Sequence, residues 1–339
     1  MPFFEIDADI SKARTIDTRF YTDAEWFEYS KEAIFARTWQ FAGLADDLKG
    51  LTPIELLPHI LDEPLLIIER DNVRHCVSNV CTHRGKVLVE RQSNADLIRC
   101  GYHGRRFDLD GRFLSMPEFD EVKDFPSPCD DLAAIPYAEF AGFAFVSPDP
   151  KAKLPEFVGG AGDLITPVEH NGLKLAAKRE YTIDAHWALY CENYLEGFHI
   201  PYVHKSLNQI VDYGTYTTET FRYSSLQTGF DDTGNIAAKY LFIFPGMMLN
   251  FYSWGVSVNV VRPLSPNRTT VEFLTYLKPG AVIGDGAGGD LHTVEMEDEQ
   301  VVESVQRGIR SRYYNSGRYS PSREQGTHHF HRLIAEFID

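Results

Sequence analysis

Two short segments, CTHRG at residues 81–85 and CGYHG at residues 100–104, each place a cysteine beside a histidine. Thiolate and imidazole ligands together suit zinc or an iron–sulfur centre. The stretch between the segments is long enough for a hairpin, so two loop tips could converge on one metal. A small β domain built around this centre is therefore expected, with a Cys2His2 zinc site as the alternative at this point. The four candidate ligands are Cys81, His83, Cys100 and His103.

Composition narrows the class of protein. The chain has 339 residues, enough for two domains, and its 43% hydrophobic and 24% charged content is that of a soluble globular protein. No apolar run reaches the length of a membrane span. A net charge of −16 argues against nucleic-acid binding through a broad basic surface. The 5 cysteines are an odd number and no secretory signal is visible, so metal binding or burial in a reducing cytoplasm is expected rather than disulfides.

Local patterns divide the chain into three segments. Residues 1–38 contain a capping-box pattern at Thr22 and Glu25, followed by apolar positions typical of a helix. Residues 39–148 carry short strands and turns, and a linker follows them. Residues 149–339 contain long β-like runs and two helices, and end in a polar tail. This organisation predicts a β domain inserted into a larger α+β domain.

Two turn signals lie within the β segment. Asp71-Asn72 separates two strand-like runs, and Asp110-Gly111 lies at the centre of RRFDLDGRFLSM. Each dipeptide is typical of the tight turn of a β-hairpin, so two hairpins are expected here.

The segment CENYLEGFHIPYVH, residues 191–204, concentrates ionisable side chains among apolar ones. Glu196 and His199 are three residues apart and are expected to share a helix face. Pro201 should end or kink this helix just before it, because proline lacks a backbone donor, and the bend can return His204 to the same centre. Two neutral imidazoles and a carboxylate are ligands typical of mononuclear non-haem Fe(II).

The C-x-H and C-x2-H pairs resemble the Rieske motif. Together with the E-x2-H-x4-H pattern, they make the chain similar over essentially its whole length to the terminal component of Rieske non-haem iron oxygenases. This resemblance implies an α+β fold in which an all-β Rieske [2Fe–2S] domain is inserted in a larger helix-grip-type catalytic domain with an antiparallel sheet. It also implies that the two cysteines hold one iron of the cluster and the two histidines hold the other. The loops lack the extra cysteines of the cytochrome bc type, which indicates a low-potential centre.

The resemblance also assigns roles to residues of the second cluster. Glu196 matches the carboxylate that links the Rieske histidine of a neighbouring subunit, here His103, to the iron ligand His199. This carboxylate relays electrons and protons between protomers, which implies a ring of at least three chains, expected to be a homotrimer. His204 would be the second histidine ligand of the iron.

The third iron ligand is expected near the start of the last long helix. Asp298 in the segment VEMEDEQ matches best, and Glu297 is the next candidate, because an offset of one residue is a common alignment error. Acids in the first turn of a helix also arise without a metal, because they complement the helix dipole.

The family resemblance implies a monooxygenase or dioxygenase that inserts oxygen from O2 into its substrate. No glycine-rich dinucleotide motif and no third cysteine cluster is present, so electrons from NAD(P)H are expected to come through a separate flavin or ferredoxin-type reductase. An alternative of another class is a Rieske electron carrier whose second domain is not catalytic.

The segments CENYLEGFHIPYVHKSL, SVQRGIRS and HHFHRL look most like the choline monooxygenase, carnitine monooxygenase and glycine-betaine demethylase branch. That likeness implies hydroxylation or N-demethylation of a quaternary ammonium compound, with aromatic-ring hydroxylation as the alternative. A trimethylammonium group has no hydrogen-bond donor, so an aromatic pocket is expected to hold it. The candidates on predicted strands are Tyr240, Phe242, Phe244, Phe251, Tyr252 and Trp254.

The remaining cysteine and histidines of this region receive no metal role. Cys191 is expected to be a small buried residue, because the iron ligands are already complete. His328, His329 and His331 are expected to be polar surface or interface residues, since their spacing matches no metal site. His186, at the start of the predicted helix, is left unassigned.

Overall fold

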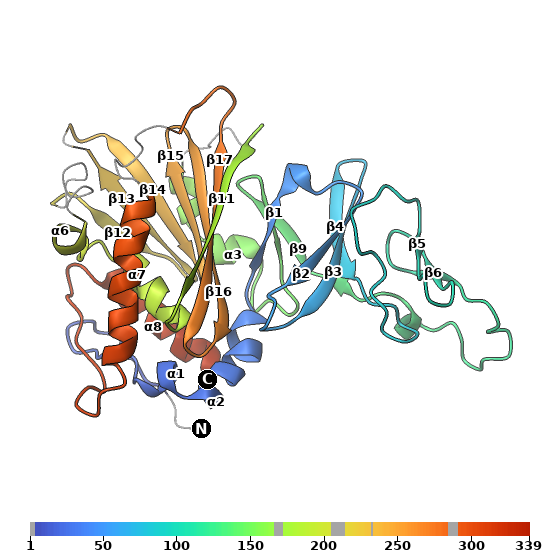
Figure 1. Cartoon of the computed structure of the whole chain (residues 1–339), viewed down its shortest axis with the longest axis horizontal. Helices are drawn as coiled ribbons and strands as arrows, with labels where there is room; N and C mark the ends of the chain where they lie inside the picture. The colour runs from blue at the N-terminus through green and yellow to red at the C-terminus, as the bar shows by residue number, and fades with distance from the viewer. Residues whose placement is uncertain (1–3, 166–171, 205–213, 232, 284–290) are drawn as a thin grey trace. The chain divides into compact units, whose positions relative to one another are not determined.

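The computed structural model describes residues 4–165, 172–204, 214–231, 233–283 and 291–339. The chain divides into two compact units, whose elements are drawn in Figure 1. The larger unit contains Met1–Thr38 and Ala152–Asp339, and the smaller unit contains Trp39–Lys151. The smaller unit is therefore an insertion in the sequence of the larger one.

The smaller unit is all-β apart from two 3-10 turns, η2 (Ala45–Asp47) and η3 (Pro128–Asp130). Antiparallel pairing produces three sheets, with strand orders β1-β10-β9, β2-β3-β4-β8 and β5-β6-β7. The strands are β1 (Gln40–Leu44), β2 (Leu51–Leu56), β3 (Glu63–Arg70), β4 (Val73–Ser78), β5 (Ile98–Arg99), β6 (Arg106–Phe107), β7 (Phe113–Ser115), β8 (Ala134–Ile135), β9 (Tyr137–Phe140) and β10 (Phe143–Val146).

Both predicted hairpins form. Asp71 and Asn72, with φ of 54° and 64°, join β3 to β4 in a two-residue turn. Two consecutive positive φ values give the turn the twist that suits the paired strands, and Asn and Asp tolerate them best after glycine. Gly111, with φ of 83°, lies in the turn between β6 and β7.

The larger unit is built on one antiparallel sheet of seven strands in the order β11-β17-β16-β15-β14-β13-β12. Every residue of β15 is buried, which indicates that both faces of the centre of the sheet are covered. The strands are β11 (Lys174–Ile183), β12 (Thr217–Thr220), β13 (Ser224–Phe230), β14 (Ile236–Ile243), β15 (Met247–Tyr252), β16 (Gly255–Ser265) and β17 (Arg268–Leu277).

Helices pack against this sheet and against one another. The described helices are α1 (Arg19–Thr22), α2 (Ala24–Ser30), the π-helical turn η1 (Lys31–Phe35), α3 (Leu154–Val158), α4 (Ala161–Leu164), α5 (Trp187–Tyr194), α6 (Ile200–Val203), α7 (Leu291–Gly308) and α8 (Gln325–Ile338). Helix α5 contacts α7, α8 and β16, while α8 also contacts β12 and η1. Figure 1 shows α7 running alongside the strands of the sheet. Within the described part of the chain, no helix has both the length and the apolar character that a membrane span requires.

The predicted α+β class, with an antiparallel sheet in the larger unit, is confirmed, but two local predictions are wrong. Asp23, not Thr22, caps the first long helix, because its carboxylate accepts the amide of Glu25 at 2.9 Å. The expected polar tail contains α8, which buries Phe330 and Leu333 on one face. Its histidines and arginine obscured the apolar period of this helix.

Candidate metal centres and active-site pocket

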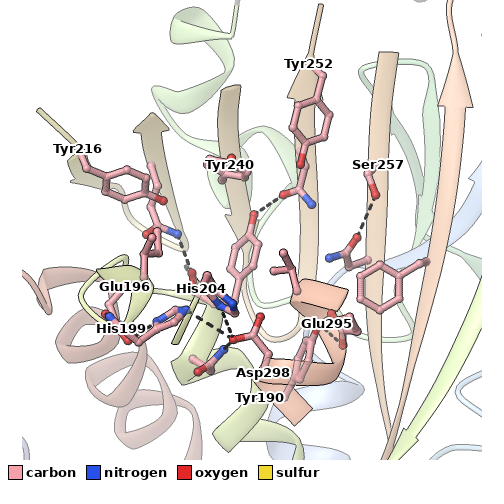
Figure 2. Close-up of a pocket in the computed structure, with 18 residues that line it drawn as sticks. Tyr190, Glu196, His199, His204, Tyr216, Tyr240, Tyr252, Ser257, Glu295 and Asp298 are labelled. Atoms are coloured by element: carbon pink, nitrogen blue, oxygen red, sulfur yellow. Dashed lines mark hydrogen bonds and ion pairs between the residues drawn. The ribbon is translucent and has the colours of Figure 1, made fainter. Parts of the chain in front are cut away.

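The three side chains predicted as iron ligands converge in the larger unit (Figure 2). One ligand atom from each of His199, His204 and Asp298 lies within 4.8 Å of the others. Asp298 Oδ1 is 3.0 Å from Nε2 of His204 and 3.5 Å from Nε2 of His199. Two imidazoles and one carboxylate that meet at a single point form the donor set of a mononuclear iron centre with open positions.

Each of the two histidines directs its other ring nitrogen at a second carboxylate. His199 Nδ1 lies 2.7 Å from Glu196 Oε1, and His204 Nδ1 lies 2.8 Å from Glu297 Oε2. An Nδ1–H donated to a carboxylate leaves the Nε2 lone pair free for a metal. Glu297 therefore lies behind His204, whereas Asp298 faces both Nε2 atoms. This geometry favours Asp298 over Glu297 as the third ligand.

The backbone that carries Glu196 and His199 is a turn, and the prediction of one shared helix face is wrong. Helix α5 ends at Tyr194, and Pro201 lies in the first turn of the separate helix α6. Proline fits there because the first turn of a helix needs no amide donor from it. Glu196 Oε2 accepts the amide of Phe198 and that of His199, the latter at 3.1 Å. One carboxylate thus supports both the start of α6 and the imidazole of His199.

Two parallel side-chain pairs join α5 to α7. The hydroxyl of Tyr190 lies 3.0 and 3.1 Å from the two carboxylate oxygens of Glu295, and the amide of Asn193 donates to Asp298 Oδ1 at 2.7 Å. Residues three apart share a helix face, so the two pairs set the rotation of α7 against α5. Burial and the nearby charge of Asp298 raise the pKa of Glu295 well above its usual value. The roles of Tyr190 and Asn193 were not predicted, although their matching three-residue spacing on both helices is visible in the sequence.

A cavity of about 150 Å³ opens beside the three converging side chains. Residues of α5, of the turn and helix that follow it, of α7 and of the sheet line it (Figure 2). The lining residues are Tyr190, Asn193, Tyr194, Glu196, His199, Ile200, His204, Tyr216, Gln227, Tyr240, Asn250, Tyr252, Ser257, Asn259, Phe273, Val294, Glu295 and Asp298.

Only part of the aromatic prediction for this cavity holds. Tyr240 and Tyr252 line it, but Phe242 and Phe244 pack against α8, and Trp254 stacks on Tyr252 with ring centroids 4.8 Å apart. Tyr240 and Phe242 alternate onto the same face of β14, but α8 covers Phe242 and Phe244, and the sequence alone could not show where α8 packs.

The alternation of side chains along β15 explains why Phe251 does not line the cavity. Asn250 and Tyr252 line the cavity from β15, so Phe251 between them points to the other face of the sheet. The aromatic lining that the sequence reasoning missed comes from other elements. Its members are Tyr190 and Tyr194 on α5, Tyr216 just before β12 and Phe273 on β17.

His328 and His331 are buried within the larger unit, so their prediction as surface residues is wrong, whereas His329 is partly exposed. His331 is 0% exposed and lies between the hydroxyls of Tyr21, at 3.2 Å, and Tyr319, at 2.5 Å. Its Nε2 is also 3.1 Å from Glu192. His328 is buried as well, and its Nε2 lies 2.8 Å from the carbonyl oxygen of Asp7. These contacts tie α8 to α5 and to the N-terminal segment.

His186 directly precedes α5 and Cys191 lies within it, and both residues are buried in the fold. His186 is the N-cap of α5, and its Nδ1 accepts the amide of Ala188 at 3.3 Å. Complete burial lowers the pKa of His186 to about 3, so the imidazole is neutral. Cys191 is 0% exposed, which confirms its prediction as a small buried residue.

In the smaller unit, the two cysteine–histidine loops have the same backbone geometry. In each loop the cysteine amide donates to the carbonyl five residues later, and the glycine amide four residues later donates back to the cysteine carbonyl. Gly85 and Gly104 have φ of 68° and 78°, a region where side chains are strained. The bonds are Cys81 N to Lys86 O (2.9 Å), Gly85 N to Cys81 O (2.9 Å), Cys100 N to Arg105 O (2.8 Å) and Gly104 N to Cys100 O (3.1 Å).

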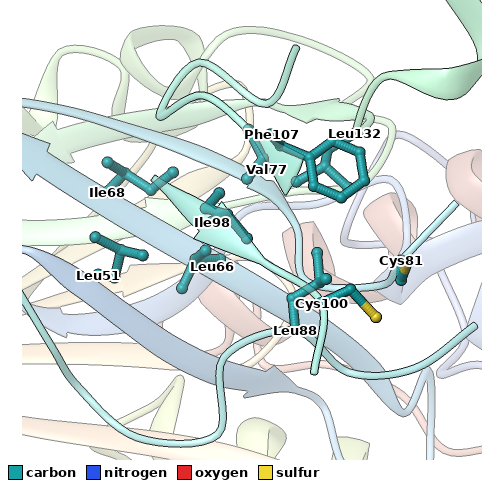
Figure 3. Packing of buried hydrophobic residues seen from close by; sticks show 10 residues of the cluster. All are labelled: Leu51, Leu66, Ile68, Val77, Cys81, Leu88, Ile98, Cys100, Phe107 and Leu132. Atoms are coloured by element: carbon teal, nitrogen blue, oxygen red, sulfur yellow. The ribbon is translucent and has the colours of Figure 1, made fainter. Parts of the chain in front are cut away.

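The side chains of these loops are arranged by chemical type. Cys81 and Cys100 belong to a buried apolar cluster with residues such as Leu66 (Figure 3). The imidazoles of His83 and His103 lie side by side, with centroids 4.9 Å apart, and His103 is exposed. Desolvation, helped by the neighbouring His103, lowers the pKa of His83, which favours the neutral form that binds metal. Two inner thiols and two outer imidazoles fit a Rieske [2Fe–2S] cluster.

A partly buried ion pair ties the two loops together. Arg105 is 2% exposed and donates to the carboxylate of Asp130 at 2.6 Å, and its guanidinium lies 4.8 Å from the centroid of the Phe113 ring. The carbonyl of Asp130 accepts from the hydroxyl of Thr82 at 2.8 Å and from Arg105 at 3.3 Å. Both loops are thus fastened to one residue, while all five cysteines are free of disulfides.

Comparison with known proteins matches both units. The family model described as "Rieske [2Fe-2S] domain" matches residues 38–126, and the one described as "Ring hydroxylating alpha subunit (catalytic domain)" matches residues 214–339. The chloroplastic choline monooxygenase of Beta vulgaris is 30% identical over 98% of this chain and 80% of its own length. The chain belongs to the Rieske non-haem iron oxygenases.

Another relative in sequence and two solved structures agree with this assignment. The carnitine monooxygenase oxygenase subunit of Escherichia coli (strain K12) is 29% identical over 97% of this chain and 95% of its own length. The crystal structure of the quaternary ammonium Rieske monooxygenase CntA with L-carnitine has a TM-score of 0.81 and 28% identity, and covers 98% of this chain and 97% of that one. Naphthalene 1,2-dioxygenase, at 18% identity and a TM-score of 0.74, shares the fold over 96% of this chain and 92% of its own. The predicted family and enzyme class are confirmed.

Proposed function

We propose that this Rieske oxygenase uses O2 to hydroxylate or N-demethylate a small quaternary ammonium compound. The observation that carries the proposal is the charge of the cavity beside the iron-ligand candidates. Among the described residues that line it, Glu196, Glu295 and Asp298 are acidic, and none is a lysine or an arginine. In the proposed site Asp298 and Glu196 offset the charge of the ferrous ion, and no lysine or arginine of the lining repels an ammonium group or pairs with an anion, which favours a cation over an anion.

The aromatic lining supports the same substrate class. The rings of Tyr216 and Tyr240 are 6.5 Å apart, and those of Tyr240 and Tyr252 are 6.2 Å apart. Ring faces attract a trimethylammonium group that can donate no hydrogen bond. Burial raises the pKa of Tyr252 well above its usual value, so its hydroxyl stays neutral. Relatives named for choline and carnitine are consistent with this proposal.

We propose that the smaller unit is the Rieske domain and that the larger unit is the catalytic domain. The proposed cluster ligands are Cys81, His83, Cys100 and His103. The proposed iron ligands are His199, His204 and Asp298. When bound, the cluster supplies single electrons and the ferrous ion binds and activates O2. The carboxylates behind the two histidines hold their Nδ1 protons, and the tyrosine-lined cavity orients the substrate and limits the access of water.

We also propose how the chains assemble and how electrons reach the iron. Glu196 contacts Nδ1 of His199 at 2.7 Å, and we propose that it also contacts His103 of a neighbouring protomer in a homotrimer. Inter-subunit electron transfer has been described for a quaternary ammonium Rieske monooxygenase that is 25% identical to this chain. Electrons from NAD(P)H would arrive through a separate flavin or ferredoxin-type reductase, and the enzyme would act in the cytoplasm.

Oxygen uptake with a surrogate reductase tests the substrate class. Choline and 3,3-dimethylbutan-1-ol have nearly the same shape, but only choline carries a charge. We expect uptake coupled to product formation with choline or other quaternary amines, and little or none with the neutral isostere or with naphthalene. Coupled formation of a phenol or diol from an arene, with no product from any quaternary amine, would contradict the proposal. A protein that holds its cluster but binds no additional iron would instead be an electron carrier.

A further inference from the structure

Glu295 lies in the cavity, but the proposed iron centre does not use it. Glu295 is 5% exposed, and its two carboxylate oxygens lie 3.0 and 3.1 Å from the hydroxyl of Tyr190. One hydroxyl has one proton, whereas an ionised carboxylate can accept about four hydrogen bonds. A buried carboxylate with so little compensation must either be protonated or meet a cation.

The position of Glu295 suits a substrate contact. It precedes Asp298 by three residues on α7, a rise of about 4.5 Å along the helix. A quaternary nitrogen is surrounded by carbon substituents, so a cation held against Glu295 presents some of these carbons toward the neighbouring iron-ligand candidates. Figure 2 shows Glu295 beside Tyr190 and apart from the two histidines.

Gln227 offers a second unused group in the same cavity. It is 1% exposed, and its Nε2 donates to the carbonyl of Tyr194 at 2.8 Å. That contact fixes which end of the amide is the oxygen, because a reversed amide would place two acceptors together. Within the described residues, Gln227 Oε1 is buried without a hydrogen-bond partner. An unpartnered buried acceptor in a ligand cavity fits a donor on the ligand.

Gln227 is part of a polar row that crosses the sheet. Gln227 on β13 lies opposite Tyr240 on β14, Tyr240 lies opposite Asn250 on β15, and Asn250 lies opposite Ser257 on β16. All four residues line the cavity, and all four side chains are neutral. Such a row suits a hydroxyl better than a carboxylate, which needs a basic partner when it is buried.

We infer that Glu295 and Gln227 determine specificity: the Glu295 carboxylate is the counter-charge of the substrate cation, and Gln227 Oε1 accepts a hydroxyl on its other arm. The preferred substrate is then a quaternary amino alcohol with one positive charge, rather than a betaine with a carboxylate. This inference rests on the proposed function and makes it more specific.

The charge contact is tested with the loaded enzyme, its reductase, choline and the neutral isostere 3,3-dimethylbutan-1-ol. Glu295→Gln removes the charge and keeps the shape, and we expect kcat/KM for choline to fall by at least about 30-fold through KM. Any residual activity with the neutral isostere should change little. Glu299→Gln is the matched control, because Glu299 lies on the same helix but does not line the cavity. An unchanged KM for choline in Glu295→Gln would show that Glu295 is a neutral structural acid and would overturn the charge contact.

The hydroxyl contact is tested by comparing choline with ethyltrimethylammonium, which lacks only the hydroxyl. Wild-type enzyme should prefer choline by about tenfold, because the other ligand leaves Gln227 Oε1 unpaired. Gln227→Leu should abolish this preference, and its circular dichroism and iron content report whether the fold is kept. A preference that persists in a folded Gln227→Leu variant would overturn the contact.

The outcome for betaines separates this inference from the proposed function. We expect glycine betaine to be at least about tenfold poorer than choline, because no basic side chain among the described lining residues meets its carboxylate. If betaine is the better substrate, the inference fails while the proposed function stands. If no quaternary amine supports coupled turnover, the proposed function itself fails.

Discussion

The register of the iron ligands can be tested by changing two neighbouring acids one at a time. Asp298→Asn alters the carboxylate oxygen that lies 3.0 and 3.5 Å from the two histidine Nε2 atoms, so we expect loss of the mononuclear iron. Glu297→Gln keeps an oxygen that can accept from His204 Nδ1, now at 2.8 Å, but it removes the negative charge. We therefore expect Glu297→Gln to weaken iron binding without abolishing it.

The expected loss of iron affinity depends on whether the side chain would contact the metal and on how far it is exposed to water. Loss of a carboxylate behind a metal-binding histidine lowers metal affinity by about 10- to 100-fold. The side chain of Glu297 is 36% exposed, so water screens its charge and we expect about tenfold, or about 1.4 kcal/mol. The side chain of Asp298 is 15% exposed and would contact the metal directly. Its replacement should cost more than about 100-fold, or about 2.7 kcal/mol.

Anaerobic titration with Fe(II), followed by metal analysis and electron paramagnetic resonance, measures both effects. At saturating iron, metal analysis should give about three irons per chain for wild-type enzyme and Glu297→Gln, and about two for Asp298→Asn. All three proteins should show the Rieske signal in electron paramagnetic resonance. Glu299→Gln is the control for a lost acid on the same helix. If Asp298→Asn binds iron normally while Glu297→Gln does not, the third ligand is Glu297 and the geometric argument is wrong.

Three further changes test other parts of the molecule. At saturating iron, Glu196→Gln should keep both metal centres but reduce turnover nearly to zero, because the negative charge proposed to link His199 to His103 of the neighbouring protomer is lost; wild-type rates would refute the relay. Arg105→Leu removes the guanidinium from the Asp130 carboxylate, which keeps its contacts with Ser127, and should lower the free energy of unfolding by about 2 kcal/mol, so an unchanged thermal midpoint would contradict the role of this ion pair in fastening the two loops. The pKa of His186 is about 3 in the fold against an ordinary 6.5, so stability is complete above pH 6.5 and should fall by about 2 kcal/mol at pH 5. His186→Asn keeps an N-cap acceptor and should remove this loss in denaturant unfolding at the two pH values; an equal loss in the variant would place its cause elsewhere.

Short-range chemistry made the smaller unit predictable. The turn at Asp71-Asn72 follows from the tolerance of these residues for positive φ, and the cysteine and histidine spacing predicted two loops, which the structure shows to have the same backbone hydrogen bonds. Asp130 was not predictable in the same way. It lies far along the chain from Thr82 and is brought to it only by folding.

Long-range packing limited the prediction of the larger unit. The candidate ligands His199, His204 and Asp298 were found from spacing and family resemblance, but neighbouring acids on α7 differ only in the direction they face. The pairs from Tyr190 to Glu295 and from Asn193 to Asp298 set that direction. Such pairs can be recognised only once α5 is known to lie beside α7.

The contacts of Glu196 in the turn after α5 limit what the turnover of Glu196→Gln can show about electron transfer. Glu196 uses Oε2 for the amides of Phe198 and His199 and Oε1 for the His199 imidazole. Glutamine has a single acceptor oxygen, so the variant must give up either the backbone contact or the imidazole contact. A weaker iron site is therefore expected even if the relay idea is wrong. Turnover must be measured with iron saturated, because only then does its loss report the missing charge rather than a missing metal.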